Sequence, residues 1–121
     1  MSRIRTFLVA ASVAAVAAVS LTASADAALP KLVGTVGPGF TITLNRFGKP
    51  LRTLKAGTYS ITVSDKSNIH NFHLRGPGVN KEITAVGFVG TKTVVVTLKK
   101  GTYSFVCDPH FTTMKGSFKA L

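Results

Sequence analysis

Short runs rich in β-branched and aromatic residues recur along residues 28–121, and glycines separate them. Val, Ile, Thr, Tyr and Phe favour strands, whereas glycine-containing segments such as 37–39 and 76–78 are typical of turns. No part of this region has a convincing helical period of apolar residues. We therefore expect an all-β protein, an antiparallel Greek-key β-sandwich of seven or eight strands. The expected strands cover residues 31–36, 40–45, 57–64, 69–75, 84–89, 92–99, 102–107 and 115–120.

A short sequence repeat accompanies two of these strands. Residues 54–60 read LKAGTYS and residues 98–104 read LKKGTYS. Two copies are too few for a repeat array, so we interpret both as the same way of entering a strand from a glycine turn. The second copy also predicts that Lys99-Lys100-Gly101 closes a tight hairpin between the strands on either side.

Alternation along the strands assigns side chains to faces, because successive residues point to opposite sides of a sheet. It places His70 on the core side together with Phe72, and Asn71 and His73 on the opposite side. It also places Cys107 on the core side, at the end of its strand. His70 and Cys107 are therefore expected to face the core together.

The first 27 residues have the features of a secretory signal peptide. Arg3 and Arg5 give a positive start, residues 7–18 form an apolar run, and Ala25-Asp26-Ala27 matches the cleavage pattern, with residues 23–25 as a second match. A retained membrane anchor is the alternative, but the apolar run is shorter than the roughly 20 residues of a spanning helix. We expect cleavage, which leaves residues 28–121 as one domain without stable membrane insertion.

Basic residues greatly outnumber acidic ones. The chain has 15 Lys and Arg against 4 Asp and Glu, and removing residues 1–27 takes away two Arg and one Asp, so the net charge falls only from +11 to about +10. Such a charge favours acidic partners. Export argues against nucleic acid, so we expect an acidic protein partner. The alternative is that the scattered basic residues only keep an exported protein soluble.

The segment from Cys107 to Met114 contains a thiol, an imidazole and a thioether within eight residues. Its pattern is Cys-x2-His-x3-Met, with His110 as the imidazole and Pro109 stiffening the loop. His70 lies 37 residues before Cys107 and can be brought close by a sandwich. Two imidazoles, a thiolate and a weak axial thioether form the blue-copper arrangement used for electron transfer. These residues therefore predict a copper site.

Other uses of the same side chains stay open at this point. Zinc would take the cysteine and two histidines, but methionine is not among its usual ligands, and the Cys-x-x-Cys-His motif of covalent haem is absent. A nucleophilic pair of Cys107 and His110 is conceivable, but no group is evident to orient a substrate, so we do not expect an enzyme. An intermolecular disulfide and a purely structural role for Cys107 are the remaining alternatives.

Two motifs resemble those of the cupredoxins, the plastocyanin/azurin-like small blue copper proteins, and in particular their exported bacterial members. They are His-Asn-Phe-His-Leu-x-Gly-Pro-Gly at residues 70–78 and Cys-Asp-Pro-His at residues 107–110. The resemblance implies a cupredoxin-like copper-binding domain over residues 28–121. It implies one copper ion, cycling between Cu(I) and Cu(II), with the ligands His70, Cys107, His110 and Met114.

The resemblance also implies residues that support the ligands from outside. Asn71 matches a residue that hydrogen-bonds to the cysteine-bearing loop in the family, and Asp108 and Pro109 belong to that loop. Asp108 would place a negative charge beside the thiolate, which favours Cu(II). Three residues separate His110 from the methionine, where plastocyanins commonly have four. His73 is the rival ligand, and otherwise a surface histidine.

These features together predict an exported, monomeric, one-electron carrier, either periplasmic or extracellular. His110 would be the electron port, and Phe111 an apolar neighbour on which an acidic redox partner docks. One alternative is a copper-binding or copper-delivery protein without fast electron transfer. Another is a structural cupredoxin-like module that lacks a working metal site.

Overall fold

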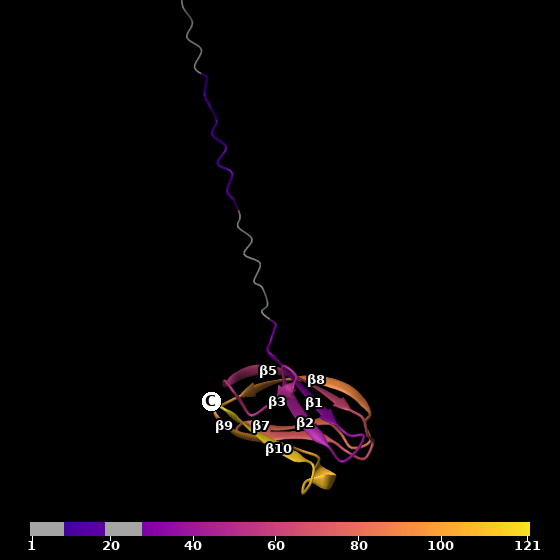
Figure 1. Ribbon diagram of the computed structural model, residues 1–121. Helices are drawn as coiled ribbons and strands as arrows, with labels where there is room; N and C mark the ends of the chain where they lie inside the picture. Colours follow the sequence, from indigo (N-terminus) through magenta and orange to yellow (C-terminus); the bar gives the residue numbers. More distant parts are fainter. Residues whose placement is uncertain (1–8, 19–27) are drawn as a thin grey trace, which may run out of the picture.

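The computed structural model describes residues 9–18 and 28–121, and its strands lie in the second range. Figure 1 shows the strands in two facing layers, the halves of a β-sandwich. Each strand turns one side to the core and the other to solvent, which is why apolar and polar residues alternate along it. The elements are β1 (Lys31–Val36), β2 (Ile42–Arg46), β3 (Lys49–Pro50), β4 (Thr53–Leu54), β5 (Gly57–Asp65), β6 (Phe72–Gly76), β7 (Val79–Thr84), β8 (Gly90–Leu98), β9 (Gly101–Val106), the 3-10 helix η1 (Asp108–His110) and β10 (Lys115–Ala120).

Each layer is a five-stranded sheet. The strand orders are β3-β2-β1-β5-β8 and β4-β10-β9-β6-β7. The predicted all-β sandwich is confirmed, with eight strands of five or more residues and the two-residue strands β3 and β4 at sheet edges. Most neighbouring strands are antiparallel, but β1 with β5 and β4 with β10 are parallel pairs. The sequence pattern missed β3 and β4 because two residues are too few to show alternation.

One predicted strand was wrong. The strand expected at residues 84–89 lies earlier, as β7, and residues 85–89 form a loop. β7 is an edge strand that Gly76-Pro77-Gly78 joins to β6 as a hairpin, so the turn decides its position. Val86 and Val89 favoured the later position by their apolar character, yet they are 50% and 60% exposed.

The predicted hairpin at Lys99-Lys100-Gly101 was also wrong. β8 and β9 belong to different sheets and do not pair, so this segment carries the chain from one sheet to the other. The hydroxyl of Tyr103 donates to the carbonyl oxygen of Lys99 at 3.0 Å, and in the first copy of the repeat Tyr59 donates to Lys55 at 2.5 Å. Both copies therefore enter a strand through the same contact, a tyrosine corner that turns the chain across the sandwich.

Packing in the core positions the first residue of β6 and the end of β9, the two strand ends that adjoin the predicted ligands His70 and Cys107. Phe72, the first residue of β6, stacks on Phe105 of β9 with ring centroids 5.8 Å apart. Gly34 of β1 makes room for this ring, since a Cβ there would lie 2.9 Å from the Phe72 side chain. His70 and Cys107, just outside these two strands, are fully buried on the core side. Packing of the two rings therefore brings the ends of β6 and β9 together.

The predicted signal peptide lies largely outside the described residues. Residues 1–8 and 19–27 are not described, and these include Arg3, Arg5 and the cleavage pattern. Residues 9–18 form neither helix nor strand. Within the described ranges, no helix has the length and apolar character needed to cross a membrane. Removal of residues 1–27 stays a prediction.

Candidate metal centre

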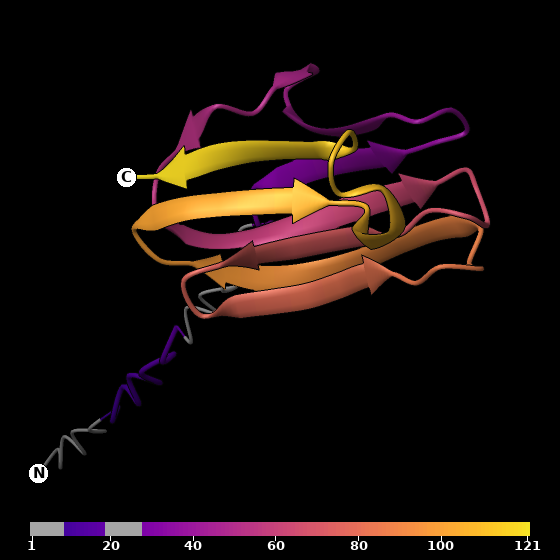
Figure 2. The same ribbon diagram turned by 90° about the horizontal axis from the view of Figure 1, so that it is seen from below.

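Four loops meet at one end of the sandwich. They are residues 37–41, 66–71, 85–89 and 107–114, and each follows a strand that runs toward this end. The parallel pair β1 and β5 brings the first two loops together, and β9 delivers the last loop beside the start of its antiparallel neighbour β6. In Figure 2 the loop after β9 curls over this end, in dark yellow. These four loops, which are distant in sequence, therefore lie together at one end of the sandwich.

The loop from Cys107 to Met114 is closed by its own backbone. The Cys107 N–H donates to the Met114 carbonyl at 3.0 Å, and the Met114 N–H donates to the His110 carbonyl at 2.8 Å. The His110 N–H in turn donates to the Cys107 carbonyl at 3.0 Å. Pro109 lies in η1, where its fixed φ suits the first turn of a helix. The loop therefore holds its three predicted ligands in defined mutual positions.

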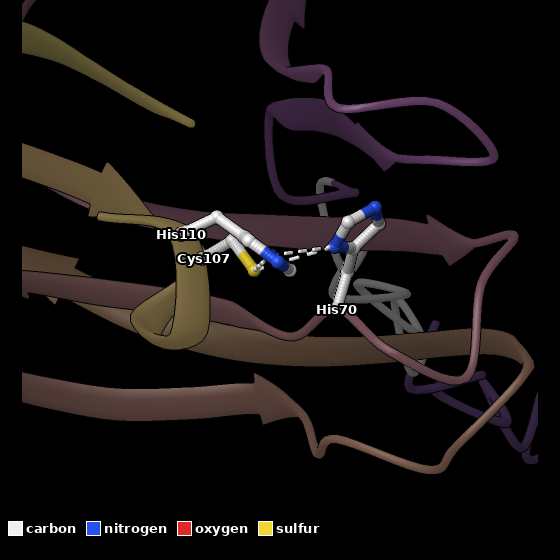
Figure 3. A group of neighbouring side chains, drawn as sticks. All are labelled: His70, Cys107 and His110. Atoms are coloured by element: carbon white, nitrogen blue, oxygen red, sulfur yellow. Dashed lines mark hydrogen bonds between the residues drawn. The ribbon is translucent and has the colours of Figure 1, made fainter. Parts of the chain in front are cut away.

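His70, Cys107 and His110 point toward one another, as Figure 3 shows. Nδ1 of His70 lies 3.1 Å from Nδ1 of His110. Cys107 Sγ lies 3.6 Å from the first of these nitrogens and 3.5 Å from the second. His70 and Cys107 are fully buried, whereas His110 is partly exposed. One upstream residue and two loop residues therefore converge on a single point at the edge of the core.

The surroundings of His70 determine which of its nitrogens is free. Its Nε2 lies 3.0 Å from the carbonyl oxygen of Gly39. A carbonyl only accepts hydrogen bonds, so Nε2 carries the proton and donates. A neutral imidazole then has a lone pair on Nδ1, the atom that faces Cys107 and His110. The Gly39 contact thus orients His70 with its unprotonated nitrogen toward the cluster.

The three donor atoms fit a copper ion in both geometry and chemistry. A triangle with the sides given above has its centre about 2.0 Å from each corner, close to ordinary metal–nitrogen distances of roughly 2.0–2.1 Å and metal–sulfur distances of about 2.3 Å. All three lie within 4.8 Å of one another. A thiolate with two imidazoles is the donor set that suits copper.

Met114, the fourth predicted ligand, is buried in the core. Its side chain is 1% exposed and belongs to the same apolar core cluster as Cys107. Its backbone holds Cys107 and His110 through the two hydrogen bonds described above. The burial keeps the thioether out of solvent on the core side of the loop. Its role as an axial ligand stays a prediction.

Asn71 joins the loop to the start of β6. Its side-chain oxygen accepts a hydrogen bond from the Asp108 backbone N–H at 2.7 Å. Its amide nitrogen donates to the Asp108 carboxylate at 2.8 Å and to the Glu82 carboxylate at 2.9 Å. Although alternation turns Asn71 away from the core, it is 1% exposed because the loop covers it. One side chain therefore bonds the residue after the cysteine through both backbone and side chain.

The carboxylate of Asp108 is surrounded by donors. Burial alone would raise the pKa of Asp108, but hydrogen bonds from Asn71 and His73 and the charges of His73 and Arg75 outweigh it, so this pKa lies below its ordinary value of 3.8. Arg75 donates to the carboxylate at 3.2 Å. The negative charge predicted beside the thiolate is therefore balanced by Arg75 on β6.

His73 belongs to a different group of side chains. Its Nδ1 donates to Asp108 at 2.7 Å, and its Nε2 lies 2.5 Å from the side-chain oxygen of Asn80. Its side chain is only 12% exposed, so the description of His73 as a surface histidine was wrong. The sequence pattern missed this network of His73, Glu82 and Asp108 because only the β6–β7 hairpin and the loop together bring its members close.

Phe40 is a site residue that sequence reasoning missed. Its ring lies edge-on to His70 and His110, with ring centroids 5.3 Å and 5.0 Å away, and it is 62% exposed. Phe111, which the sequence singled out, is exposed to the same extent at 63%. The Gly37-Pro38-Gly39 turn before Phe40 was its one signal, because such a turn marks a loop and functional residues are often found on loops.

Comparisons with known proteins give a family and structures of similar fold. Residues 45–120 match the model of the copper binding proteins of the plastocyanin/azurin family. Rusticyanin from Thiobacillus ferrooxidans is 25% identical, with a TM-score of 0.52 over 75% of this chain and 76% of that one. Reduced rusticyanin is 24% identical, with a TM-score of 0.56 over 75% and 78%. No curated protein matches in sequence.

A third similar structure is a chain of a heme-copper terminal oxidase dimer. It is 17% identical, with a TM-score of 0.53 over 75% of this chain and 63% of that one. At this identity the likeness concerns the fold alone. The match of the family model covers more than half of the chain, including His70, Cys107, His110 and Met114. The chain therefore belongs to the plastocyanin/azurin family of copper-binding proteins.

Proposed function

We propose that this protein is an exported one-electron carrier with a type 1 copper site. His70, Cys107 and His110 would be the equatorial ligands and Met114 the weak axial ligand. The observation that carries the proposal is the triangle of one sulfur and two nitrogens with sides of 3.1 to 3.6 Å. When bound, copper would supply the Cu(II)/Cu(I) couple.

The chain itself supplies a rigid and largely dry ligand set. The loop is closed by its backbone hydrogen bonds, and Asn71 bonds it to β6, so ligand movement between oxidation states is restricted. Burial of His70, Cys107 and Met114 keeps water from the donor atoms. His110 alone among the four is partly exposed, and Phe40 and Phe111 lie near it at the surface. This supports His110 as the electron port.

The sequence features before residue 28 support export, and the charge supports an acidic redox partner. Residues 28–121 contain thirteen basic residues and three acidic ones. Basic side chains would steer an acidic partner toward the protein, and electron-transfer rates would fall as salt screens this attraction. Rates with an acidic partner that do not change with ionic strength would contradict the steering role.

The first experiment is titration of the purified protein with Cu(II), followed by visible absorption and EPR on the same sample. We expect an intense thiolate-to-copper band that saturates at one equivalent, with a narrow copper hyperfine splitting. Cys107→Ser should lose the band because the thiolate is its origin. Thr112→Ala, an exposed change in the same loop, is the matched control and should keep it.

Two results would overturn the electron-carrier proposal. Tight Cu(I) binding without the visible band would favour copper binding or delivery. Failure to bind either ion would leave a structural module. Thr112→Ala serves the Cys107→Ser comparison: if it keeps the band, the loss in Cys107→Ser comes from the missing thiolate and not from a disturbed loop.

A further inference from the structure

A groove runs along the outer face of the second sheet, beside the cysteine-bearing loop. It has a volume of about 780 Å³ and is lined by residues of β6, β9, β10 and the loop. Its lining includes two basic residues, one carboxylate, two hydroxyl side chains and one aromatic ring, which belong to Arg75, Lys115, Asp108, Ser104, Ser117 and Phe111. This volume lies within the range of roughly 300–1,000 Å³ that is usual for ligand sites.

Strand register makes the floor of the groove continuous. Val106 of β9 is opposite Lys115 of β10, and Ser104 is opposite Ser117. Arg75 of β6 is opposite Ser104 on the other side. Small hydroxyl side chains therefore form the floor, while Lys115 and Arg75 stand on either side of it. Phe111, 63% exposed, stands at the end nearest the loop.

The groove carries two basic side chains, of which Arg75 is paired with Asp108 and Lys115 is not. In the described ranges, Asp108 is the one carboxylate near a basic side chain, with Arg75 as its ion-pair partner and His73 as a hydrogen-bond partner. Lys115 is exposed and has no ion pair among those residues. The Arg75 side chain is 54% exposed, so part of its guanidinium is open to a second acceptor. The groove therefore has two positive charges, on Arg75 and Lys115, and one negative charge, on Asp108.

The opposite face of the sandwich differs in character. On the outer side of β5 and β8, Thr58 bonds to Thr97 and Thr62 bonds to Thr93, so these hydroxyls are paired across the strands.

The groove is also close to the metal centre along the chain. Cys107 lies between two residues that line it, Val106 and Asp108. Phe111 belongs to the exposed apolar side chains of the loop-bearing end, together with Phe40. A molecule bound in the groove would therefore contact the basic side chains of Arg75 and Lys115 and the ring of Phe111, which follows His110 in the chain.

We propose that this groove is a docking site for an acidic segment of the redox partner. Carboxylates of that segment would pair with Lys115 and Arg75 and accept hydrogen bonds from Ser104 and Ser117, while an apolar side chain packs on Phe111. The proposal rests on the electron-carrier function, since it names the surface on which that partner binds. A partner bound in the groove would contact Val106 and Asp108, the two residues that flank Cys107 in the chain.

The test uses 15N-labelled protein and the synthetic peptide acetyl-Asp-Glu-Phe-Asp-Glu-amide at low ionic strength. Amide chemical shifts are recorded during titration, with and without one equivalent of Cu(I). We expect the largest shifts at residues 104–106, at Phe111 and at residues 115–117. The uncharged peptide with Asn and Gln in place of Asp and Glu should cause none. Shifts confined to other surfaces, or no shifts at millimolar peptide, would overturn the proposal.

Charge-reversal variants provide the matched comparison. Lys115→Glu should weaken peptide binding about fivefold, because it replaces an attraction within the groove by a repulsion. Lys31→Glu makes the same charge change at the exposed first residue of β1, in the other sheet, and should weaken binding less than about twofold. Equal losses in both variants would indicate general attraction and contradict the groove.

These outcomes are separable from failure of the copper function. Peptide binding is measured without copper as well, so a chain that binds no copper can still show the groove to be occupied. Conversely, a normal thiolate-to-copper band in Lys115→Glu shows that the metal centre is intact when docking is lost.

Discussion

Asn71 and Asp108 are joined by two hydrogen bonds in opposite directions. The Asp108 backbone N–H donates to the Asn71 side-chain oxygen at 2.7 Å, and the Asn71 amide donates back to the Asp108 carboxylate at 2.8 Å. One residue directly follows the predicted ligand His70 and the other directly follows Cys107. This pair therefore ties together the two segments that hold the donor atoms.

Asn71→Ala should loosen that connection. It leaves the partly buried N–H of Asp108 without its partner, so we expect the free energy of unfolding to fall by about 1–3 kcal/mol. Chemical denaturation of the copper-free protein measures this loss. Asn80→Ala is the control, because Asn80 is exposed and bonds to His73 alone, and its effect should stay within about 0.5 kcal/mol. Equal losses of unfolding free energy in Asn71→Ala and Asn80→Ala would contradict a special role of Asn71 in joining the two segments.

Asp108 should make the copper-free protein sensitive to acid. Its pKa in the folded state lies below the ordinary value of 3.8, so the unfolded chain binds the proton more readily. The stability contributed by Asp108 is present above pH 3.8 and is lost as the pH falls through the lower, folded pKa. We therefore expect the difference in unfolding free energy between the parent and Asp108→Asn to be largest near neutral pH and to shrink in acid. A difference that is constant with pH would contradict this.

Met114→Leu should change the redox behaviour more than the fold. Leucine has a similar volume, so the unfolding free energy should change by less than about 1.5 kcal/mol. Loss of the thioether removes a weak donor to Cu(II), so the thiolate-to-copper band should persist while the reduction potential rises. Voltammetry measures the potential. Leu98→Met, buried at the far end of β8, is the control and should leave the potential unchanged. An unchanged potential in Met114→Leu would exclude axial ligation.

The tyrosine corners should affect stability without affecting copper. Tyr59→Phe removes a hydrogen bond to Lys55, and Tyr103→Phe removes a hydroxyl that lies 3.0 Å from the carbonyls of both Lys99 and Pro77. We expect each change to cost about 1 kcal/mol of unfolding free energy, with the larger loss at Tyr103. Denaturation curves measure the cost. A weakened copper band in either variant would show that these corners also hold the metal centre.

Alternation and residue chemistry predicted much of this protein from sequence. Eight strands of five or more residues, seven of them close to their expected positions, follow from period-two patterns. The core side of His70 and Cys107 follows from the same alternation, and the rarity of Cys and Met in residues 28–121 drew attention to the copper ligands. These are local properties, because each depends on neighbours along the chain.

Pairing between distant strands decided the rest. Which sheet a strand joins depends on contacts with residues far along the chain, so the pattern mistook the crossing at residues 99–101 for a hairpin and placed β7 too late. The contact of Gly39 with His70, the packing of Phe40 and the network around Asp108 likewise arise only where loops meet. The sequence by itself determined the donor atoms, whereas the tertiary structure decided their orientation and surroundings, because hydrogen-bond partners and burial are properties of the assembled sandwich.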